Sequence, residues 1–395
     1  MNQKTDLVKV YFDNAATTPL RSEVVEVIST NLKETFGNPS SIHGYGRKAK
    51  TTIESARKSI AKQFNAAASE IIFTSGGTES DNMIFYCAVN DLGVQKIITS
   101  KIEHHAVLHA AEKIAKKGIS LEYVALDEEG SVDVNHLEIL LSNNNQTTLV
   151  SLMHINNEIG NVLDLEAVGK LCKKYGAYFH SDAVQGVGHF HLDFSSLPID
   201  FLSASAHKFH GPKGIGFLYV SNALRLQSMI KGGGQERGLR AGTEAVHNIV
   251  GMATALELAY QNYDTEHQHI LEIKKYFLDQ IHAVFPGAIF NGLSGDITRS
   301  TNTLVNISLP INQDKAKILD FHLDLNGIAC SKGSACQSGS SQGSHVINEL
   351  QREHQNSYWP TLRFSFSCFN SKSEIDHLIT VLRQFATREK PLANS

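Results

Sequence analysis

Three polar segments that follow apolar runs contain the residue types needed to bind an aldehyde cofactor. Ser75-Gly-Gly-Thr78 stands between an apolar run and a helix-like segment, where helix N–H groups favour a phosphate or carboxylate. Asp182 directly follows the run 177–181; it suits a helix N-cap, but a buried carboxylate there would also keep a heterocyclic nitrogen protonated. Lys208 follows the run 200–205, and a desolvated lysine has a lowered pKa and forms Schiff bases. Together these groups are what pyridoxal phosphate requires.

Cys336, Arg363 and His104 are the other candidates for chemistry. Cys336 stands in the segment 331–344, where nine of fourteen residues are Gly or Ser, so we expect a mobile loop that buries no core. A thiolate there could act as a nucleophile, although an incidental thiol fits as well. Arg363 could hold a substrate carboxylate or serve as a structural ion-pair partner. His104 follows the apolar run 96–100 and could stack on an aromatic cofactor or lie on the surface.

His105 and His109 have the i, i+4 spacing of a helical metal site. No HExxH motif accompanies them and no third ligand is evident, so we expect no metal. The five cysteines are scattered without a CxxC pair, which indicates neither a disulfide framework nor a structural zinc site.

The elements that must position these residues alternate along the first 220 residues. Apolar runs typical of strands alternate with stretches typical of helices: runs 71–74, 96–100, 121–125, 148–153, 177–181, 200–205 and 216–220, and stretches 79–90, 104–117 and 166–175. This alternation predicts an α/β fold with a mainly parallel, doubly wound sheet. In such sheets ligands lie beyond the carboxyl ends of the strands, where the candidate residues stand.

A second α+β pattern predicts a smaller C-terminal domain. A helix-rich stretch covers 245–285, and further elements cover 303–308, 318–326, 362–365 and 374–387. We expect a large cofactor-binding domain over 15–260. A small α+β domain, made of 1–14 and 261–395, would carry the loop 331–344.

Composition excludes several classes of protein. The chain has 395 residues, of which 42% are hydrophobic and 19% charged, as in ordinary soluble proteins. A net charge of −4 without a long run of Lys or Arg argues against nucleic acid as a partner. No apolar stretch approaches the roughly 20 residues of a membrane span, and the first residues lack the apolar core of a signal peptide. We therefore expect a cytoplasmic enzyme.

A set of motifs spread from about Tyr11 to about Arg383 resembles the cysteine desulfurases. The motifs are Tyr11-Phe-Asp-Asn-Ala-Ala-Thr-Thr18, Gly37-Asn-Pro39, Thr74-Ser-Gly-Gly-Thr-Glu-Ser-Asp-Asn82, Ser100-Lys-Ile-Glu-His-His-Ala106, Met153-His-Ile-Asn-Asn-Glu-Ile-Gly160, Asp182-Ala-Val-Gln185, His207-Lys208, Gly232-Gly-Gly-Gln-Glu-Arg-Gly-Leu-Arg-Ala-Gly-Thr243 and Gly333-Ser-Ala-Cys336. The last of them is similar to the branch with a long Ser-Gly-Ser-Ala-Cys loop. The resemblance implies a fold type I, aminotransferase-like architecture, a homodimer and pyridoxal phosphate as cofactor.

The resemblance also implies a role for each matching position. Lys208 would bind the cofactor covalently and, once released, shuttle the Cα proton of the substrate, while His104 would stack on the ring. The other cofactor-binding positions would be Gly77, Thr78, Asn157, Asp182, Gln185, Ser205, His207 and, from the neighbouring subunit, Thr243. The substrate, L-cysteine, would be bound by Asn157, Arg363 and Asn38.

The implied reaction converts L-cysteine to L-alanine. The Cys336 thiolate would attack the substrate sulfur, and the loop would carry the resulting persulfide to an acceptor protein. An iron–sulfur scaffold is one such acceptor, and Cys336 could then also hold a transient iron–sulfur cluster. A selenocysteine lyase or another pyridoxal-phosphate enzyme of the same fold is an alternative. A catalytically silent sulfur-relay protein is another, which the complete cofactor set disfavours.

Three residues depart from the family pattern. Lys332 stands where the family has a small residue, and its charge could lower the pKa of the Cys336 thiol. Cys330 could capture the sulfur of Cys336 or form a disulfide with it. Cys368 stands where the family has arginine, and the sequence gives no account of it.

Overall fold

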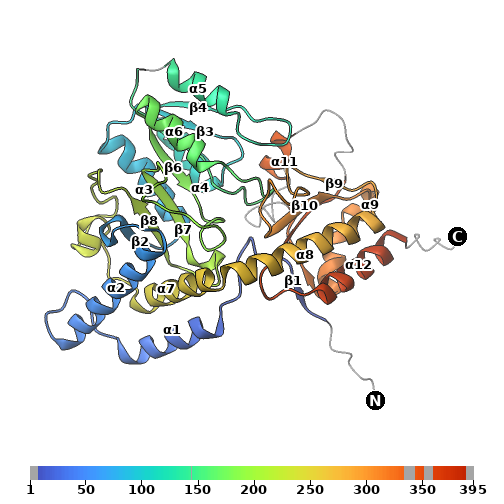
Figure 1. The fold of residues 1–395 in the computed structure, drawn as a ribbon, viewed down its shortest axis with the longest axis horizontal. Helices are drawn as coiled ribbons and strands as arrows, with labels where there is room; N and C mark the ends of the chain where they lie inside the picture. The colour runs from blue at the N-terminus through green and yellow to red at the C-terminus, as the bar shows by residue number, and fades with distance from the viewer. Residues whose placement is uncertain (1–7, 144, 333–342, 351–358, 388–395) are drawn as a thin grey trace.

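The computed structural model of the chain describes residues 8–143, 145–332, 343–350 and 359–387. Its central element is a seven-stranded sheet with the strand order β2-β8-β7-β6-β5-β3-β4 (Figure 1). The strands are β2 (Ile71–Thr74), β3 (Lys96–Thr99), β4 (Ser120–Tyr123), β5 (Thr148–Ser151), β6 (Tyr178–Asp182), β7 (Phe201–Ser205) and β8 (Gly216–Val220). β8 is antiparallel to both neighbours, and the other pairs are parallel. The predicted α/β fold with a mainly parallel sheet is confirmed.

Helices cover both faces of this sheet. On one face lie α2 (Gly44–Gln63), α5 (Val134–Ser142), α6 (Leu165–Tyr175) and α7 (Val246–Gln261), and on the other lie α3 (Gly77–Asn90) and α4 (His105–Ala115). Successive strand side chains point to opposite faces, so Ile71 and Phe73 pack in the first layer and Ile72 in the second. Both faces are buried, which explains why these strands are mostly apolar, whereas the edge strand β4 is only half-buried and carries Glu122.

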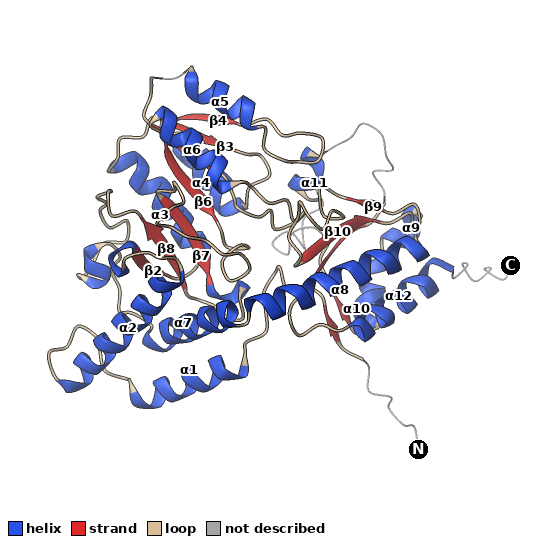
Figure 2. Ribbon diagram, in the orientation of Figure 1, coloured by secondary structure: helices blue, strands red, loops and turns tan. Residues whose placement is uncertain are grey.

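A second, smaller set of strands has its own hydrophobic core, to the right in Figure 2. It comprises the antiparallel strands β9 (Ile289–Phe290), β10 (Leu304–Ser308) and β12 (Thr361–Ser365), and the parallel pair β1 (Val10–Tyr11) and β11 (Ile328–Ala329). Its helices are α8 (Tyr263–Val284), α9 (Gln313–Ala316), α10 (Leu319–Leu325) and α12 (Lys372–Thr387). The short helix α11 (His345–Glu349) instead packs through Val346 against Ile102 and Ile159. β1 shows that the N-terminal part of the described chain joins this C-terminal core.

The strands predicted before residue 220 are confirmed to within two residues at each end. The sequence analysis did not predict α1 (Ser22–Glu34), α2 or α5. In α2 the signal was present, because Ala49, Ile53, Ala56 and Ile60 are buried at three- and four-residue spacing. Most of the predicted loop, residues 333–342, lies outside the described residues.

Candidate active site

A cavity of about 240 Å³ lies at the carboxyl ends of β2, β6 and β7. Ten of the predicted site residues line it: Gly77, Thr78, His104, Asn157, Asp182, Gln185, Ser205, His207, Lys208 and Arg363. Nine of them end or follow strands of the large sheet, because parallel strands bring their carboxyl ends to one edge. Arg363 comes from β12 of the small sheet, so the cavity lies where the two sets of strands meet.

Lys208 is held in place by the backbone of the segment before α1. It ends the short 3₁₀ helix Ala206–Lys208 that follows β7. Its Nζ donates to the carbonyl oxygens of Ala15 at 2.6 Å and Ala16 at 2.8 Å. The Gln185 amide donates to the same Ala15 oxygen at 2.9 Å, and His189 Nε2 donates to the Lys208 carbonyl at 3.0 Å. The amine is therefore fixed at the cavity wall by contacts that sequence analysis did not find.

Asp182 is a buried carboxylate at the last position of β6, with 5% of its surface exposed. Burial raises the pKa of the Asp182 carboxyl. The nearby His104, a hydrogen bond from the Val184 N–H and the Lys208 charge act in the opposite direction and lower this pKa in part. Burial also lowers the pKa of His104, whose Nδ1 accepts the Ala106 N–H at 3.1 Å. The site therefore combines a carboxylate that lacks solvent with an uncharged, flat imidazole, an arrangement suited to a cationic aromatic ring.

The opposite end of the cavity is suited to an anion. The helix α3 starts at Gly77 with no side-chain cap, so its first N–H groups are available to a ligand. A Cβ at Gly77 would lie 2.5 Å from Val184 Cγ2, which explains the need for glycine at this position. Thr78, Ser205 and His207 add side-chain donors on the same wall. Burial, with the Lys208 charge, lowers the pKa of His207 to about 4.

The sequence analysis missed several residues of the cavity wall, above all Asp81, Glu158 and His345. Asp81 lies one helical turn after Gly77 in α3, a spacing that could have identified it. Its Oδ1 lies 3.6 Å from His180 Nε2. Burial and the nearby Asp182 charge raise the pKa of Asp81 well above its usual range. Burial and the neighbouring Asp182 thus favour the protonated form of Asp81.

Glu103 is a second buried acid close to the cavity. Its Oε1 accepts the Ser100 hydroxyl at 2.8 Å and the Met153 N–H at 3.1 Å. Burial raises the pKa of Glu103 from 4.5 to about 8, and the charge of Asp182 adds to this rise. Because the folded-state pKa is the higher one, the stabilising contribution of Glu103 is complete below its unfolded-state pKa. It is lost as the pH rises through the folded-state value.

We expect Glu103→Gln to remove this pH dependence, because a glutamine amide matches the shape of the neutral acid. At about pH 5 the variant and the parent should melt together. At about pH 9 the variant should melt a few °C higher, since the parent then carries a buried, ionised carboxylate. Calorimetric melting at both pH values measures the difference. Equal melting temperatures at about pH 9 would show that ionisation of Glu103 does not destabilise the folded protein.

Three predicted residues do not line the described cavity. Asn38 is exposed and accepts the Ser40 N–H at 2.9 Å. Thr243 is exposed in the segment before α7. Cys336 lies outside the described residues.

Two of the residues that depart from the family pattern lie at the start of the segment that leads to Cys336. Burial raises the pKa of the Cys330 thiol to about 12, and Asp13 and Asp320 add to this effect. A thiol that stays protonated is a poor sulfur acceptor, which argues against sulfur capture by Cys330. Lys332 Nζ forms an ion pair with Asp320 at 2.8 Å, and its effect on the Cys336 pKa stays a prediction.

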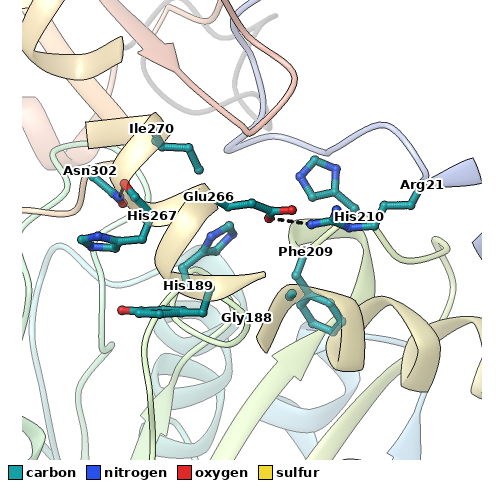
Figure 3. A pocket seen from close by; sticks show the side chains of 11 residues that line it. Arg21, Gly188, His189, Phe209, His210, Glu266, His267, Ile270 and Asn302 are labelled. Atoms are coloured by element: carbon teal, nitrogen blue, oxygen red, sulfur yellow. Dashed lines mark hydrogen bonds and ion pairs between the residues drawn. The ribbon is translucent and has the colours of Figure 1, made fainter. Parts of the chain in front are cut away.

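Cys368 lies next to His210, one of the residues that line the small cavity drawn in Figure 3. Its Sγ is 3.9 Å from His210 Nε2. Figure 3 shows Arg21, from the segment before α1, pointing at Glu266 of α8, and the two form an ion pair at 2.6 Å that lines this cavity. Burial, with the Glu266 charge, raises the pKa of Cys368 to about 11. A guanidinium is therefore present near Cys368, where the family has an arginine, but in this chain it belongs to Arg21.

Metal-binding and membrane-spanning features are not found in the described ranges. Among these residues no group of three or more His, Cys, Asp or Glu side chains could hold a metal ion. The rings of His105 and His109 stack with their centroids 4.9 Å apart. No described helix combines the length and apolarity that crossing a bilayer requires.

Comparison with known proteins identifies the class of this site. Residues 10–378 match the aminotransferase class-V family. The chain therefore belongs to that family, whose enzymes depend on pyridoxal phosphate. Its relatives place it, within the family, among the cysteine desulfurases. The expected family, fold type and cofactor are confirmed.

The similarity extends over nearly the whole chain. The cysteine desulfurase IscS of Dictyoglomus turgidum is 41% identical over 98% of this chain and 96% of its own. A cysteine desulfurase of Nostoc sp. is 37% identical over 97% of this chain and 94% of its own. A solved NifS-like protein has a TM-score of 0.86 at 33% identity and covers 95% of this chain and 99% of its own. A structure described as SspA in complex with cysteine has a TM-score of 0.80 at 31% identity, with coverages of 92% and 100%.

Proposed function

We propose that the chain converts L-cysteine to L-alanine and transfers the sulfur through Cys336 to an acceptor protein. The central observation is that Lys208, Asp182 and Arg363 line one cavity of about 240 Å³. Relatives named as cysteine desulfurases and the cysteine complex of SspA support the reaction and its substrate. An amine, a buried carboxylate and a guanidinium together suit an amino acid that reacts on pyridoxal phosphate.

The cavity residues fit this cofactor. The uncapped start of α3 at Gly77 would hold the phosphate, with side-chain donors from Thr78, Ser205 and His207. The buried Asp182 carboxylate would pair with the ring nitrogen, Gln185 would bind the ring hydroxyl, and the neutral His104 imidazole would stack on the ring, near Asn157. When bound, pyridoxal phosphate supplies an electron sink for the pair left by a broken Cα–H bond.

The substrate would be bound on the side of the small sheet. Arg363 and Asn157 would bind L-cysteine there, with Asn38 as a further contact. Lys208 Nζ would take the Cα proton as a general base and return a proton later. The two backbone carbonyls that hold this amine, at 2.6 and 2.8 Å, keep it at the cavity wall.

Cys336 would take up the sulfur. Its thiolate would attack the substrate sulfur, so that a sulfur–sulfur bond forms while the Cβ–sulfur bond breaks and leaves its electron pair on the carbon skeleton. Protonation of that skeleton gives alanine. Cysteine and the Cys336 thiol thus yield alanine and the Cys336 persulfide, and no separate oxidant or reductant is needed.

The acceptor and the setting follow from the same chemistry. A persulfide needs a second thiol or a metal-binding scaffold to receive its sulfur, so we propose an acceptor protein, with an iron–sulfur scaffold as one candidate. Cys336 could hold a transient iron–sulfur cluster during that transfer. We propose a cytoplasmic location, because reduced thiols persist in that compartment.

We further propose that the chain acts as a homodimer. Large apolar side chains are exposed over α1 and the start of α2, among them Val25 at 47%, Leu32 at 55%, Phe36 at 69% and Tyr45 at 60%. An apolar area of this kind is typical of an interface. Thr243 would reach the phosphate site of the partner subunit, and light scattering measures the oligomeric state.

The division of the chain into a domain of 15–260 and one of 1–14 with 261–395 is also a proposal. α7 packs against α1 and α2, whereas α8 packs against α12. These contacts support a boundary near residue 260.

Purified protein incubated with L-cysteine and a reductant should produce alanine and sulfide in equal amounts. Without reductant, mass spectrometry should find one additional sulfur atom on the peptide that contains Cys336. Serine, which has no sulfur, is the control substrate. Sulfide that appears without alanine would contradict the proposal.

We expect Asp182→Asn to slow turnover roughly 100-fold while the cofactor stays bound. The neutral amide cannot balance a protonated ring, and the loss of a charge-assisted hydrogen bond of about 2–3 kcal/mol corresponds to that factor. Steady-state alanine formation and the cofactor content of the purified variant measure the two effects. Unchanged turnover would show that Asp182 does not contact the ring.

A further inference from the structure

The Arg363 guanidinium is almost completely buried, with 1% of the residue exposed. Its Nη1 donates to the Asn157 carbonyl at 2.7 Å, and its Nη2 donates to Asp13 Oδ1 at 3.0 Å and to Ser331 Oγ at 3.3 Å. Nε has no hydrogen-bond partner among the described residues. Three of the five guanidinium N–H groups therefore have partners that fix its orientation, while the Nε–H and the second N–H of Nη1 have no such partner among the described residues.

Asp13 is the only carboxylate in these contacts, and it has a second partner. The same oxygen, Oδ1, accepts the Ser331 hydroxyl at 2.7 Å. The backbones of Ser331 and Arg363 also pair, at 2.8 and 3.2 Å, as an isolated antiparallel bridge. One carboxylate oxygen thus joins the guanidinium to a residue that stands five positions before Cys336.

Asp13 is set apart from the cavity that Arg363 lines. Its backbone is bridged to Ser365 of β12, two residues after Arg363. Asp13 does not line the cavity, so it would act on a ligand there only through Arg363. A buried guanidinium that loses its carboxylate leaves a charge without compensation, so its position would change.

We propose that Asp13 is a positioning residue that orients Arg363 for the substrate carboxylate and ties that group to the base of the Cys336 segment through Ser331. The inference rests on the proposed function, in which Arg363 binds the carboxylate of L-cysteine. If Asp13 only competed with the substrate for Arg363, its removal would strengthen binding. If Asp13 positions Arg363, its removal should instead weaken the binding of the substrate.

The test compares two ligands that differ in the carboxylate. The holoenzyme is titrated with L-alanine, which has the carboxylate, and with ethylamine, which lacks it, and the change in cofactor absorption gives each Kd. Asp13→Ala should raise the Kd for L-alanine about tenfold, the effect of about one charge-assisted hydrogen bond, and leave the Kd for ethylamine unchanged. Asp13→Asn keeps an acceptor oxygen but loses the charge, so its Kd for L-alanine should lie between those of the parent and Asp13→Ala.

Two further variants separate the possible outcomes. Asp320→Ala breaks the neighbouring ion pair with Lys332 and should change neither Kd. Ser331→Ala removes only the hydroxyl that shares Asp13 Oδ1 and should weaken L-alanine about threefold. Thermal melting shows whether the Asp13 variants fold. If they do not, the Ser331→Ala variant still tests the proposal.

Several results would overturn the inference: tighter L-alanine binding in Asp13→Ala, equal weakening of both ligands, or no change in the Asp13 and Ser331 variants. The assignment of Arg363 is tested separately. If Arg363→Ala keeps the preference of the parent for L-alanine over ethylamine, Arg363 does not bind the carboxylate. If Arg363→Ala abolishes the preference while Asp13→Ala preserves it, only the role of Asp13 fails.

Discussion

Replacing Lys208 with alanine is expected to lower the turnover of L-cysteine by more than about 10³-fold and to abolish the covalent attachment of the cofactor. Lys208 would both bind the cofactor aldehyde and move the Cα proton, so one substitution removes two functions. Among the described residues that line the cavity, Lys208 is the only lysine. The visible absorption of the purified protein and the rate of alanine formation measure the two losses.

Lys213 provides a matched control. It is an exposed lysine five positions after Lys208, and it does not line the cavity. Lys213→Ala should keep the colour and the turnover of the parent. A Lys208→Ala protein in which borohydride reduction still links the cofactor to the chain would contradict the assignment, since another amine would then hold it.

Replacing Cys336 with serine is expected to lower alanine formation by more than about 10³-fold, because a hydroxyl cannot accept sulfur as a persulfide. The cavity residues are unchanged in this variant, so L-cysteine should still bind and change the cofactor spectrum. The expected result is therefore a protein that binds substrate but does not turn it over. Stopped-flow absorption measures binding, and an alanine assay measures the reaction.

Cys330 is the matched control for Cys336. Its thiol is held in the protonated form by burial, which raises its pKa to about 12, and it packs against the core of the small sheet. Cys330→Ala should keep turnover within about twofold, since it is not the nucleophile. If Cys330→Ala abolished the reaction and Cys336→Ser preserved it, the two roles would have to be exchanged.

Much of the candidate site could be predicted from the sequence because it follows strands of one parallel sheet. Asp182 and Lys208 are 26 positions apart in the chain, yet each stands within three residues of the end of an apolar run. The carboxyl ends of parallel strands meet at one edge, so the order of runs and polar residues was enough to bring them together. The same rule does not apply to Arg363, whose two possible roles the sequence left open. The structure shows both an ion pair with Asp13 and a place in the cavity wall.

The contacts that hold the reactive groups could not be predicted in this way. Backbone carbonyls of Ala15 and Ala16 accept the Lys208 amine, but a carbonyl has no sequence signature because every residue has one. The spacing from Gly77 could have identified Asp81, but not its raised pKa, which results from burial beside Asp182 and therefore depends on packing. The guanidinium near Cys368 comes from Arg21, which is so distant in the sequence that no local pattern relates the two residues.

The sequence by itself determined the α/β class, the strands of the large sheet and the residue types at their carboxyl ends. These depend on local patterns, since hydrophobic periodicity and turn residues act over a few neighbours. Only the tertiary structure decided which distant segments meet: residues 13–16 reach both Lys208 and Arg363, across some 190 and 350 positions of chain. Such contacts arise from the packing of two hydrophobic cores against each other, and no local pattern encodes them.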